Sequence, residues 1–118
     1  MQHFANLVVW QRAHALALEV YRRTAAFPRE ERYGLTSQLR RAAASVAANI
    51  AEGAKRRSET EFARHLNIAE ASLAESAYFV MLARDLGYLP ASAAAALETD
   101  ADEIARMLHR LRERVVDP

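Results

Sequence analysis

Hydrophobic positions along the chain recur every three or four residues, which is the spacing of one face of an α-helix. Segments rich in glycine, proline and polar residues separate four such stretches, and each stretch is about three turns or longer. The apolar line is Trp10, Ala13, Ala17, Val20, Thr24 and Phe27 in the first stretch, Phe62, Leu66, Ala69, Leu73 and Val80 in the third, and Leu97, Ala101, Ile104, Leu108, Leu111 and Val115 in the fourth. The pattern predicts four amphipathic helices.

The segments that connect these helices are short. Pro28 ends the first helix because its ring cannot continue the hydrogen-bond ladder. The sequence "SETE" predicts a reciprocal cap, in which Ser58 accepts a hydrogen bond from the Glu61 N–H while the Glu61 carboxylate returns to Ser58. A further short turn after Pro28 is expected to dock onto the core through Tyr33 and Leu35. Because short connections favour antiparallel neighbours, we expect an all-α, up-down-up-down antiparallel four-helix bundle.

The second stretch carries small side chains around most of the predicted helix. Its apolar line of Leu39, Val46 and Ile50 is sparse, and no charged residue lies between Arg41 and Glu52. Many of the remaining positions hold alanine: Ala42, Ala43, Ala44, Ala47, Ala48 and Ala51. A helix exposed on one side normally carries charge there, whereas small residues allow other helices to approach closely. We therefore expect this helix to pack against its own bundle on one side and against another subunit on the other.

A polar stripe follows the second predicted helix at spacings of three and four residues. Its members are Gln38, Arg41, Ser45, Asn49 and Glu52. Antiparallel pairing with the third helix, with a break at Gly53, places Asn49 near Glu61 and Phe62, and also places Arg41 near Glu70.

The third predicted helix offers polar partners for this stripe. They are Ser72, Glu75 and Ser76. An unmatched buried donor or acceptor costs about 1–3 kcal/mol, so we interpret these groups as a structural network that fixes the helix register. The alternative is a polar pocket, formed by Arg41, Asn49, Glu52 and Glu75, that serves a small ligand or an enzymatic reaction.

Composition favours a single helical domain over residues 1–118. The chain is 52% hydrophobic and has only three glycines and three prolines, too few for the many turns of an all-β fold. The absence of cysteine excludes disulfides, cysteine zinc sites and thiol nucleophiles. The amino end does not resemble a signal segment, and no apolar run approaches the roughly 20 residues of a membrane span. We expect a cytoplasmic protein with no membrane partner.

The formal net charge of +1 conceals two unequal halves. Residues 1–57 carry ten lysines or arginines and four acids, whereas residues 58–118 carry six and eleven. Either the halves attract each other, in the fold or across subunits, or the excess of cations forms a basic surface that binds nucleic acid.

The sequence "GAKRRS" is the strongest anion-attracting feature of the chain. Lys55, Arg56 and Arg57 come directly before the N-terminus of the third predicted helix, where cations and the helix dipole both favour an anion. These three residues are candidates for contact with RNA or DNA. Arg22, Arg23 and Arg40 are candidates for extending the same patch.

The sequence contains little that resembles a catalytic or metal site. Ferritin-like oxidases need Glu-x-x-His, which does not occur here, and Glu61 and His65 form only an isolated pair one turn apart. No glycine elbow surrounds Ser45 or Ser72, so neither is expected to be a nucleophile. His14 is expected to be half-buried in a helix seam. We predict no catalytic residue, no metal and no cofactor.

Three segments resemble a known family. They are "LVVWQRAHALALEVYRRT", "FPREERYGLTSQLRRAAASVAANIAEG" and "EFARHLNIAEASLAE". They are similar to bacterial four-helix-bundle proteins encoded by reading frames inside intervening sequences of 23S ribosomal RNA genes. The resemblance covers residues 4–111, and the accessory variability determinant proteins of diversity-generating retroelements are similar relatives.

The resemblance implies an up-down bundle that assembles as a ring of five and has no demonstrated catalysis. Among the retroelement relatives it also implies basic surfaces that engage nucleic acid and a reverse transcriptase. Its signature falls on Gln38, Arg41, Ser45, Asn49, Glu52, Gly53, Ser72 and Glu75. The combined prediction is a non-enzymatic homo-oligomer, a pentamer, that acts as a scaffold or adaptor and presents its basic loop to nucleic acid or a nucleic-acid enzyme.

Overall fold

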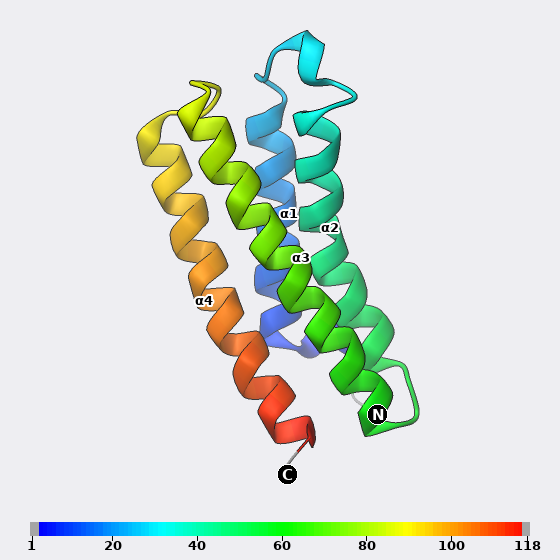
Figure 1. The fold of residues 1–118 in the computed structure, drawn as a ribbon. Helices are drawn as coiled ribbons and strands as arrows, with labels where there is room; N and C mark the ends of the chain where they lie inside the picture. Colours follow the sequence, from blue (N-terminus) through cyan, green and yellow to red (C-terminus); the bar gives the residue numbers. More distant parts are fainter. Residues whose placement is uncertain (1–2, 117–118) are drawn as a thin grey trace.

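Four long helices form most of the chain in a computed structural model that describes residues 3–116 (Figure 1). They are α1 (Val8–Thr24), α2 (Leu35–Ala54), α3 (Glu59–Asp85) and α4 (Ala91–Val116), with short 3-10 helices η1 (Phe4–Asn6) and η2 (Arg29–Glu31). Within the described residues there is no strand, which confirms the predicted all-α class. None of these helices is both long and apolar enough to cross a membrane.

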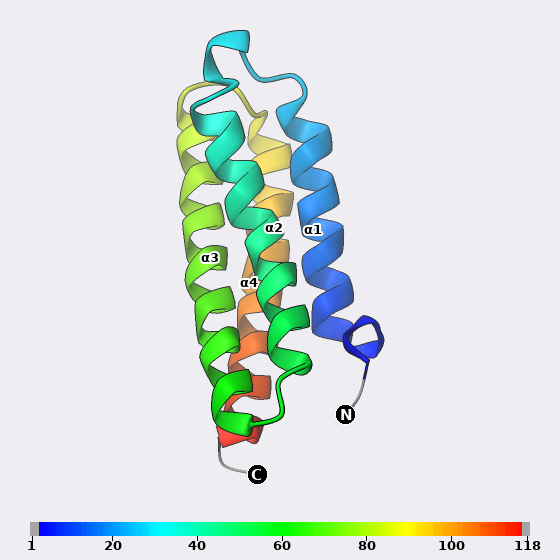
Figure 2. The ribbon, with the colours of Figure 1, turned by 90° about the vertical axis from the view of Figure 1, so that its right-hand side faces the viewer.

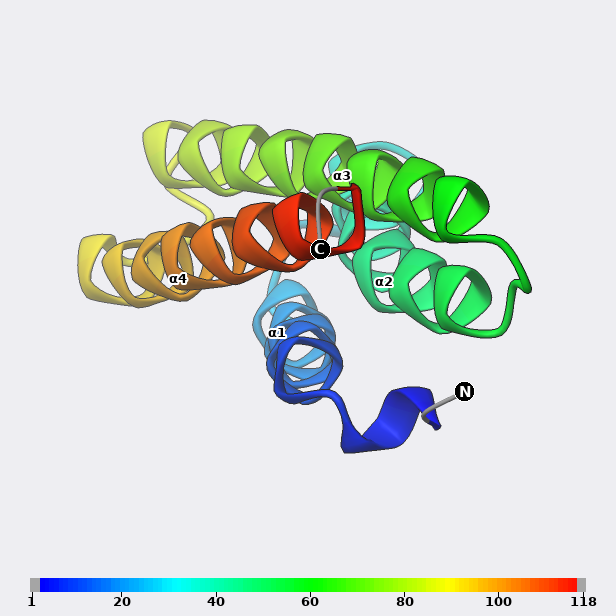
Figure 3. The same ribbon diagram turned by 90° about the horizontal axis from the view of Figure 1, so that it is seen from below.

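The helices lie side by side in an elongated body of 44 × 23 × 20 Å. Consecutive helices run in opposite directions along its long axis, with the loops after α1 and α3 at one end and the loop after α2 at the other (Figures 1 and 2). Viewed along that axis, α3 lies beside both α2 and α4, while α1 lies beside α2 and α4 on the opposite side (Figure 3). The ends of α2 are therefore at opposite ends of the molecule.

Local sequence signals set the helix ends. Ser58 accepts a hydrogen bond of 3.0 Å from the Glu61 N–H, which confirms this half of the predicted cap. The predicted return contact is wrong, because the Glu61 carboxylate forms an ion pair with Arg64 instead of bonding to Ser58. Gly87 has a positive φ of 81°, a conformation that glycine adopts without steric cost, and the chain turns there between α3 and α4. Pro90 directly precedes α4, where its missing N–H leaves no helical hydrogen bond unmade.

The predicted apolar lines form the core. Ala13, Leu39, Leu66, Ile104 and Leu108 are almost fully buried, and nearly all other members of the lines are buried or packed against the core. Because hydrophobic periods identify the buried side of a helix directly, this part of the fold follows from the sequence.

Two aromatic positions differ from expectation. His14 is exposed and stacks on Trp10 with 5.0 Å between ring centroids, so it is not a half-buried seam residue. Tyr33 is 87% exposed, whereas Leu35 is buried, so of the two only Leu35 packs onto the core. The reason is local: Leu35 is the first residue of α2 and faces inward, while Tyr33 precedes the helix in an outward-facing turn.

Ion pairs connect helices across the bundle. Arg12 on α1 donates a hydrogen bond to Glu103 on α4, and this contact lowers the pKa of the Glu103 carboxyl below its usual value. Arg84 on α3 reaches Glu98 on α4 at 3.4 Å. Both pairs are partly exposed, so they orient the helices more than they stabilise them.

Gly53 lies inside α2, although its position suggested a helix break. The glycine is buried, and a Cβ atom built on it lies 2.7 Å from the His65 Cβ and 2.9 Å from a ring carbon of Phe62. Contacts that short leave no room for a side chain. Glycine at this position therefore allows the last turn of α2 to approach α3 closely.

Gly53→Ala tests this close approach. We expect a net loss of up to about 2.5 kcal/mol in the free energy of unfolding, because overpacking costs roughly 1–3 kcal/mol and the gain in helix propensity offsets only about 0.5–1 kcal/mol of it. Chemical denaturation measures the change. Ala96→Gly on the exposed side of α4 is the matched control and reports helix propensity alone. A Gly53→Ala protein more stable than the parent contradicts the close-packing argument.

Candidate functional site

A chain of polar side chains joins α2 to α3 in the middle of their contact. The Asn49 side-chain amide donates to the Ser45 carbonyl oxygen at 2.9 Å and to the Ser45 hydroxyl at 3.0 Å. The Ser45 hydroxyl in turn lies 2.9 Å from the Ser72 hydroxyl. The side-chain oxygen of Asn49, Oδ1, lies 3.2 Å from the His65 Nδ1 atom. We call Ser45, Asn49, His65 and Ser72 the polar cluster.

The register between α2 and α3 differs from the predicted one. Asn49 contacts His65, which is about one turn further along α3 than the predicted neighbours Glu61 and Phe62. The cause is Gly53: because α2 continues through it to Ala54, the connecting loop begins later than expected. The later loop shifts every pairing between the two helices.

Four residues of the predicted network lie outside the polar cluster, namely Gln38, Arg41, Glu52 and Glu75. Gln38, Arg41 and Glu75 are exposed, and their side chains form no hydrogen bond or ion pair within residues 3–116. Glu70, expected near Arg41, instead accepts a hydrogen bond from Arg112 on α4. The small-ligand pocket suggested as an alternative needs Arg41 and Glu75 beside Asn49, and the structure does not bring them there.

His65 is the cluster member that the sequence analysis did not identify. Because the Asn49 amide nitrogen donates to Ser45, its oxygen is the acceptor, so the His65 proton is on Nδ1. The His65 Nε2 atom is buried without a hydrogen-bond partner among the described residues. The Glu52 side chain is exposed, and its carboxylate lies 3.7 Å from the His65 Nδ1 atom. The available signal was spacing, because His65 lies seven residues before Ser72 and therefore on the same face of α3.

The geometry of the polar cluster suits a structural role. Ser45 and Ser72 bond to each other, and within residues 3–116 neither is hydrogen-bonded to a histidine or a carboxylate that could activate it. Ser76, also expected to join, donates instead to the Ser72 backbone carbonyl within α3. Across the described residues, no group of three or more histidine or acidic side chains is arranged to hold a metal ion.

The candidate basic residues divide between two ends of the bundle. Lys55, Arg56 and Arg57 are exposed in the loop between α2 and α3, and the two arginines line a hollow of about 350 Å³ beside Phe62 and Leu111. We call residues 55–57 the basic loop.

Arg22, Arg23 and Arg40 lie at the opposite end, near the C-terminus of α1 and the N-terminus of α2. Along the α2 axis, at about 1.5 Å per residue, Arg40 is roughly 22 Å from Lys55. Arg22 and Arg23 also form ion pairs with Glu19 within α1. The expectation that these residues extend one continuous patch is therefore wrong, because α2 separates them by nearly its whole length.

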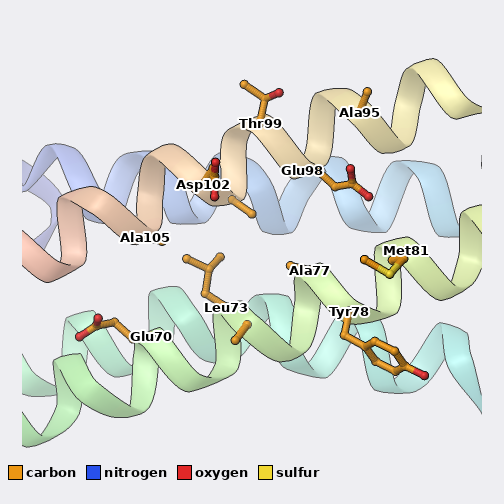
Figure 4. A pocket seen from close by; sticks show the side chains of 12 residues that line it. Glu70, Leu73, Ala77, Tyr78, Met81, Ala95, Glu98, Thr99, Asp102 and Ala105 are labelled. Atoms are coloured by element: carbon orange, nitrogen blue, oxygen red, sulfur yellow. The ribbon is translucent and has the colours of Figure 1, made fainter.

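A groove of about 770 Å³ follows the contact between α3 and α4 (Figure 4). Its floor is largely apolar, and Leu73 extends from α3 towards α4 within it. The three carboxylates along it are each within 4 Å of an arginine of the same chain, since Glu70 pairs with Arg112, Glu98 with Arg84 and Asp102 with Arg106.

Comparison with known proteins assigns the chain to a family. The family model described as 23S rRNA-intervening sequence protein matches residues 5–110. The chain belongs to this family. A similar solved structure is a protein with unknown function from the S23 ribosomal protein family of Bacteroides thetaiotaomicron VPI-5482, with a TM-score of 0.81 and 23% sequence identity. The match covers 90% of this chain and 99% of that one, and no curated protein matches.

The match confirms the family suggested by the sequence. The similarity to the Bacteroides protein supports the shared four-helix fold and carries no function with it. Members of the family have no known enzymatic activity, and the function of the family is unknown. A role for this chain therefore has to be argued from its own surfaces.

Asn49→Leu tests whether the polar cluster fixes the register. The substitution leaves the His65 Nδ1–H without its acceptor, so we expect the free energy of unfolding to fall by about 1–3 kcal/mol or the subunit number to change. Asn67→Leu is the matched control, because Asn67 is exposed on α3 and its substitution should change stability by less than about 0.5 kcal/mol. Denaturation and light scattering measure both variants. An Asn49→Leu protein that melts and assembles like the parent refutes the register role.

Proposed function

We propose that this antiparallel four-helix bundle is a non-enzymatic cytoplasmic scaffold that assembles with copies of itself. The observation that carries the proposal is the outward face of α2. Ala44 and Ala48 are exposed there, and the side chains of Gln38 and Arg41 beside them have no bonding partner within residues 3–116.

The middle of α2 exposes only small, uncharged side chains. The exposed positions of α1 include larger side chains such as Leu18 and Tyr21, and those of the second half of α4 are mostly charged, such as Arg106 and Arg110. On α2, the exposed positions between Arg41 and Glu52 are alanine. Small side chains allow a neighbouring helix to approach closely, and the polar residues at the edges of such a face can supply directional contacts. These features favour a second copy of the chain as the occupant.

The resemblance to ring-forming relatives supports five copies. A closed ring needs two different surfaces on each subunit, one on each side, because head-to-tail contacts repeat around the axis. The alanine face of α2 supplies one surface. The apolar groove between α3 and α4 lies elsewhere on the bundle and is a candidate for the other.

Ala48→Glu tests the assembly. Light scattering at micromolar concentration should give the parent a mass several times the 13.2 kDa of the chain, and about five times for a pentamer. A carboxylate at position 48 should reduce the mass to that of one chain without loss of helicity, because burying an unpaired charge is unfavourable. Ala96→Glu, on the exposed side of α4, is the control and should leave the assembly intact. A monomeric parent defeats the proposal.

A second proposed role is binding of RNA or DNA by the basic loop, either directly or together with a nucleic-acid enzyme. The supporting observation is that Lys55, Arg56 and Arg57 are exposed side by side and form no ion pair within residues 3–116. Lys55 lies over the Phe4 ring, with 5.7 Å between its Nζ atom and the ring centroid. Cations without an acidic partner, placed just before α3, can neutralise backbone phosphates without first breaking an ion pair.

Replacing all three residues of the basic loop with alanine tests this role. The slope of log affinity against log salt should fall in magnitude by about 2–3 if each cation contacts one phosphate. The matched control replaces Arg106, Arg110 and Arg114, which are exposed on α4, and removes the same charge. Fluorescence anisotropy with labelled RNA and DNA measures both proteins. Equal losses in the two triple variants show that only net charge matters and contradict a site at the loop.

A further inference from the structure

A cavity of about 490 Å³ lies at the end of the bundle opposite the basic loop. It lies where the C-terminal turn of α1, the segment after η2 and the first turns of α2 meet. Its lining consists of Tyr21, Arg32, Tyr33, Thr36, Ser37, Arg40 and Arg41. We call it the tyrosine–arginine cavity.

The charged residues that line this cavity are all cationic. Three of its lining residues are arginines and none is acidic, whereas the groove between α3 and α4 is lined by three carboxylates. The nearby Glu31 carboxylate is already bound, because it accepts hydrogen bonds from the Leu35 N–H and the Tyr88 hydroxyl, each at 3.0 Å. The arginines of the cavity therefore have no competing anion in its lining.

One arginine is fixed in place. The Arg40 guanidinium donates to the Thr24 hydroxyl at 2.7 Å and to the Tyr21 carbonyl oxygen at 3.2 Å, and its centre lies 4.6 Å from the centroid of the Tyr21 ring. These contacts hold a planar cation against an aromatic ring before any ligand arrives. A preformed arrangement of this kind lowers the entropy cost of binding.

The two tyrosines of the cavity are exposed. Tyr33 is 87% exposed and Tyr21 is 47% exposed, so nearly all of Tyr33 and about half of Tyr21 remain accessible to a ligand. Arg32 lies over Tyr33, with 5.5 Å between its guanidinium carbon and the ring centroid. The turn that carries Tyr33 is itself held, because the Tyr88 hydroxyl bonds to Glu31 in η2 and the Tyr88 ring packs against Phe27. Exposed aromatic rings on a held backbone form a stacking platform.

We propose that the tyrosine–arginine cavity binds a nucleotide unit, with the base stacked on Tyr33 or Tyr21 and the phosphate held by the arginines. Aromatic rings stack on any base, and arginine forms bidentate hydrogen bonds with phosphate. The cavity volume lies within the roughly 300–1,000 Å³ typical of small-molecule sites. A single-stranded nucleic acid and a free nucleotide both present this chemistry. The site is separate from the basic loop and does not depend on it.

The experiment isolates the cavity from the basic loop. In a protein whose Lys55, Arg56 and Arg57 are alanine, fluorescence anisotropy measures binding of a short labelled single-stranded oligonucleotide, and calorimetry measures binding of AMP. Tyr33→Ala should weaken binding about fivefold or more through loss of stacking, while Tyr33→Phe should keep it within about twofold. Tyr78→Ala removes another exposed tyrosine, one that lies on α3, and should have no effect. Because Tyr33 is so exposed, thermal melting should show that each Tyr33 variant folds.

The two ligands and a phosphate control identify what is recognised. Stronger binding of the oligonucleotide than of AMP assigns the site to single strands, and the reverse assigns it to free nucleotides; both support the proposal. Inorganic phosphate that competes as well as AMP overturns it, because the base then contributes nothing. Absence of binding to both ligands, or binding unchanged by Tyr33→Ala, also overturns it. Neither result bears on the basic loop or on assembly, which are tested separately.

Discussion

The close contact between α2 and α3 is the constraint on which the other features of the molecule depend. Gly53 lets the backbones approach, since any side chain at that position meets His65 and Phe62 at less than 3 Å. Beside this close approach, the hydrogen bonds of the polar cluster connect the two helices in the observed register. With that register set, Arg41 and Glu75 point away from the contact and remain exposed. The internal packing thus decides which residues the molecule offers to partners.

Periodicity predicted the fold because burial of one helix face is a property of the sequence alone. The apolar lines and the four-helix class follow from it, and the Ser58 cap follows from the local "SETE" motif. Features that depend on the contact between two helices could not be predicted from periodicity. The sequence alone does not show whether Gly53 ends a helix or permits a close approach between two helices. The predicted register was therefore wrong by about one turn. His65 was missed for a related reason, because only the register shows that it faces Asn49.

The structure shows where the excess cations of the first half of the sequence lie. Among the residues that the structure describes, Arg12 is the one cation of the first half that pairs with the second half, through Glu103 and more distantly Asp100. Attraction between the halves therefore accounts for only a small part of the excess. Most of the remaining cations lie near the two ends of α2, in the basic loop and in the tyrosine–arginine cavity. The sequence showed the excess of cations in the first half, but it led us to expect one continuous patch. Composition does not show how far apart two groups of cations lie along a helix axis.

The arrangement along α2 connects assembly with binding. The helix has small exposed residues in its middle and cations towards both ends, roughly 22 Å apart. Copies joined through the middle of α2 therefore repeat both cationic groups around the assembly. If the proposed assembly and binding both hold, a long polyanion that reaches several subunits would bind by many weak contacts at once, and its avidity would rise by orders of magnitude without any single tight site. Dissociating the subunits should thus weaken the binding of a long strand far more than the binding of a mononucleotide, since only the strand spans several subunits.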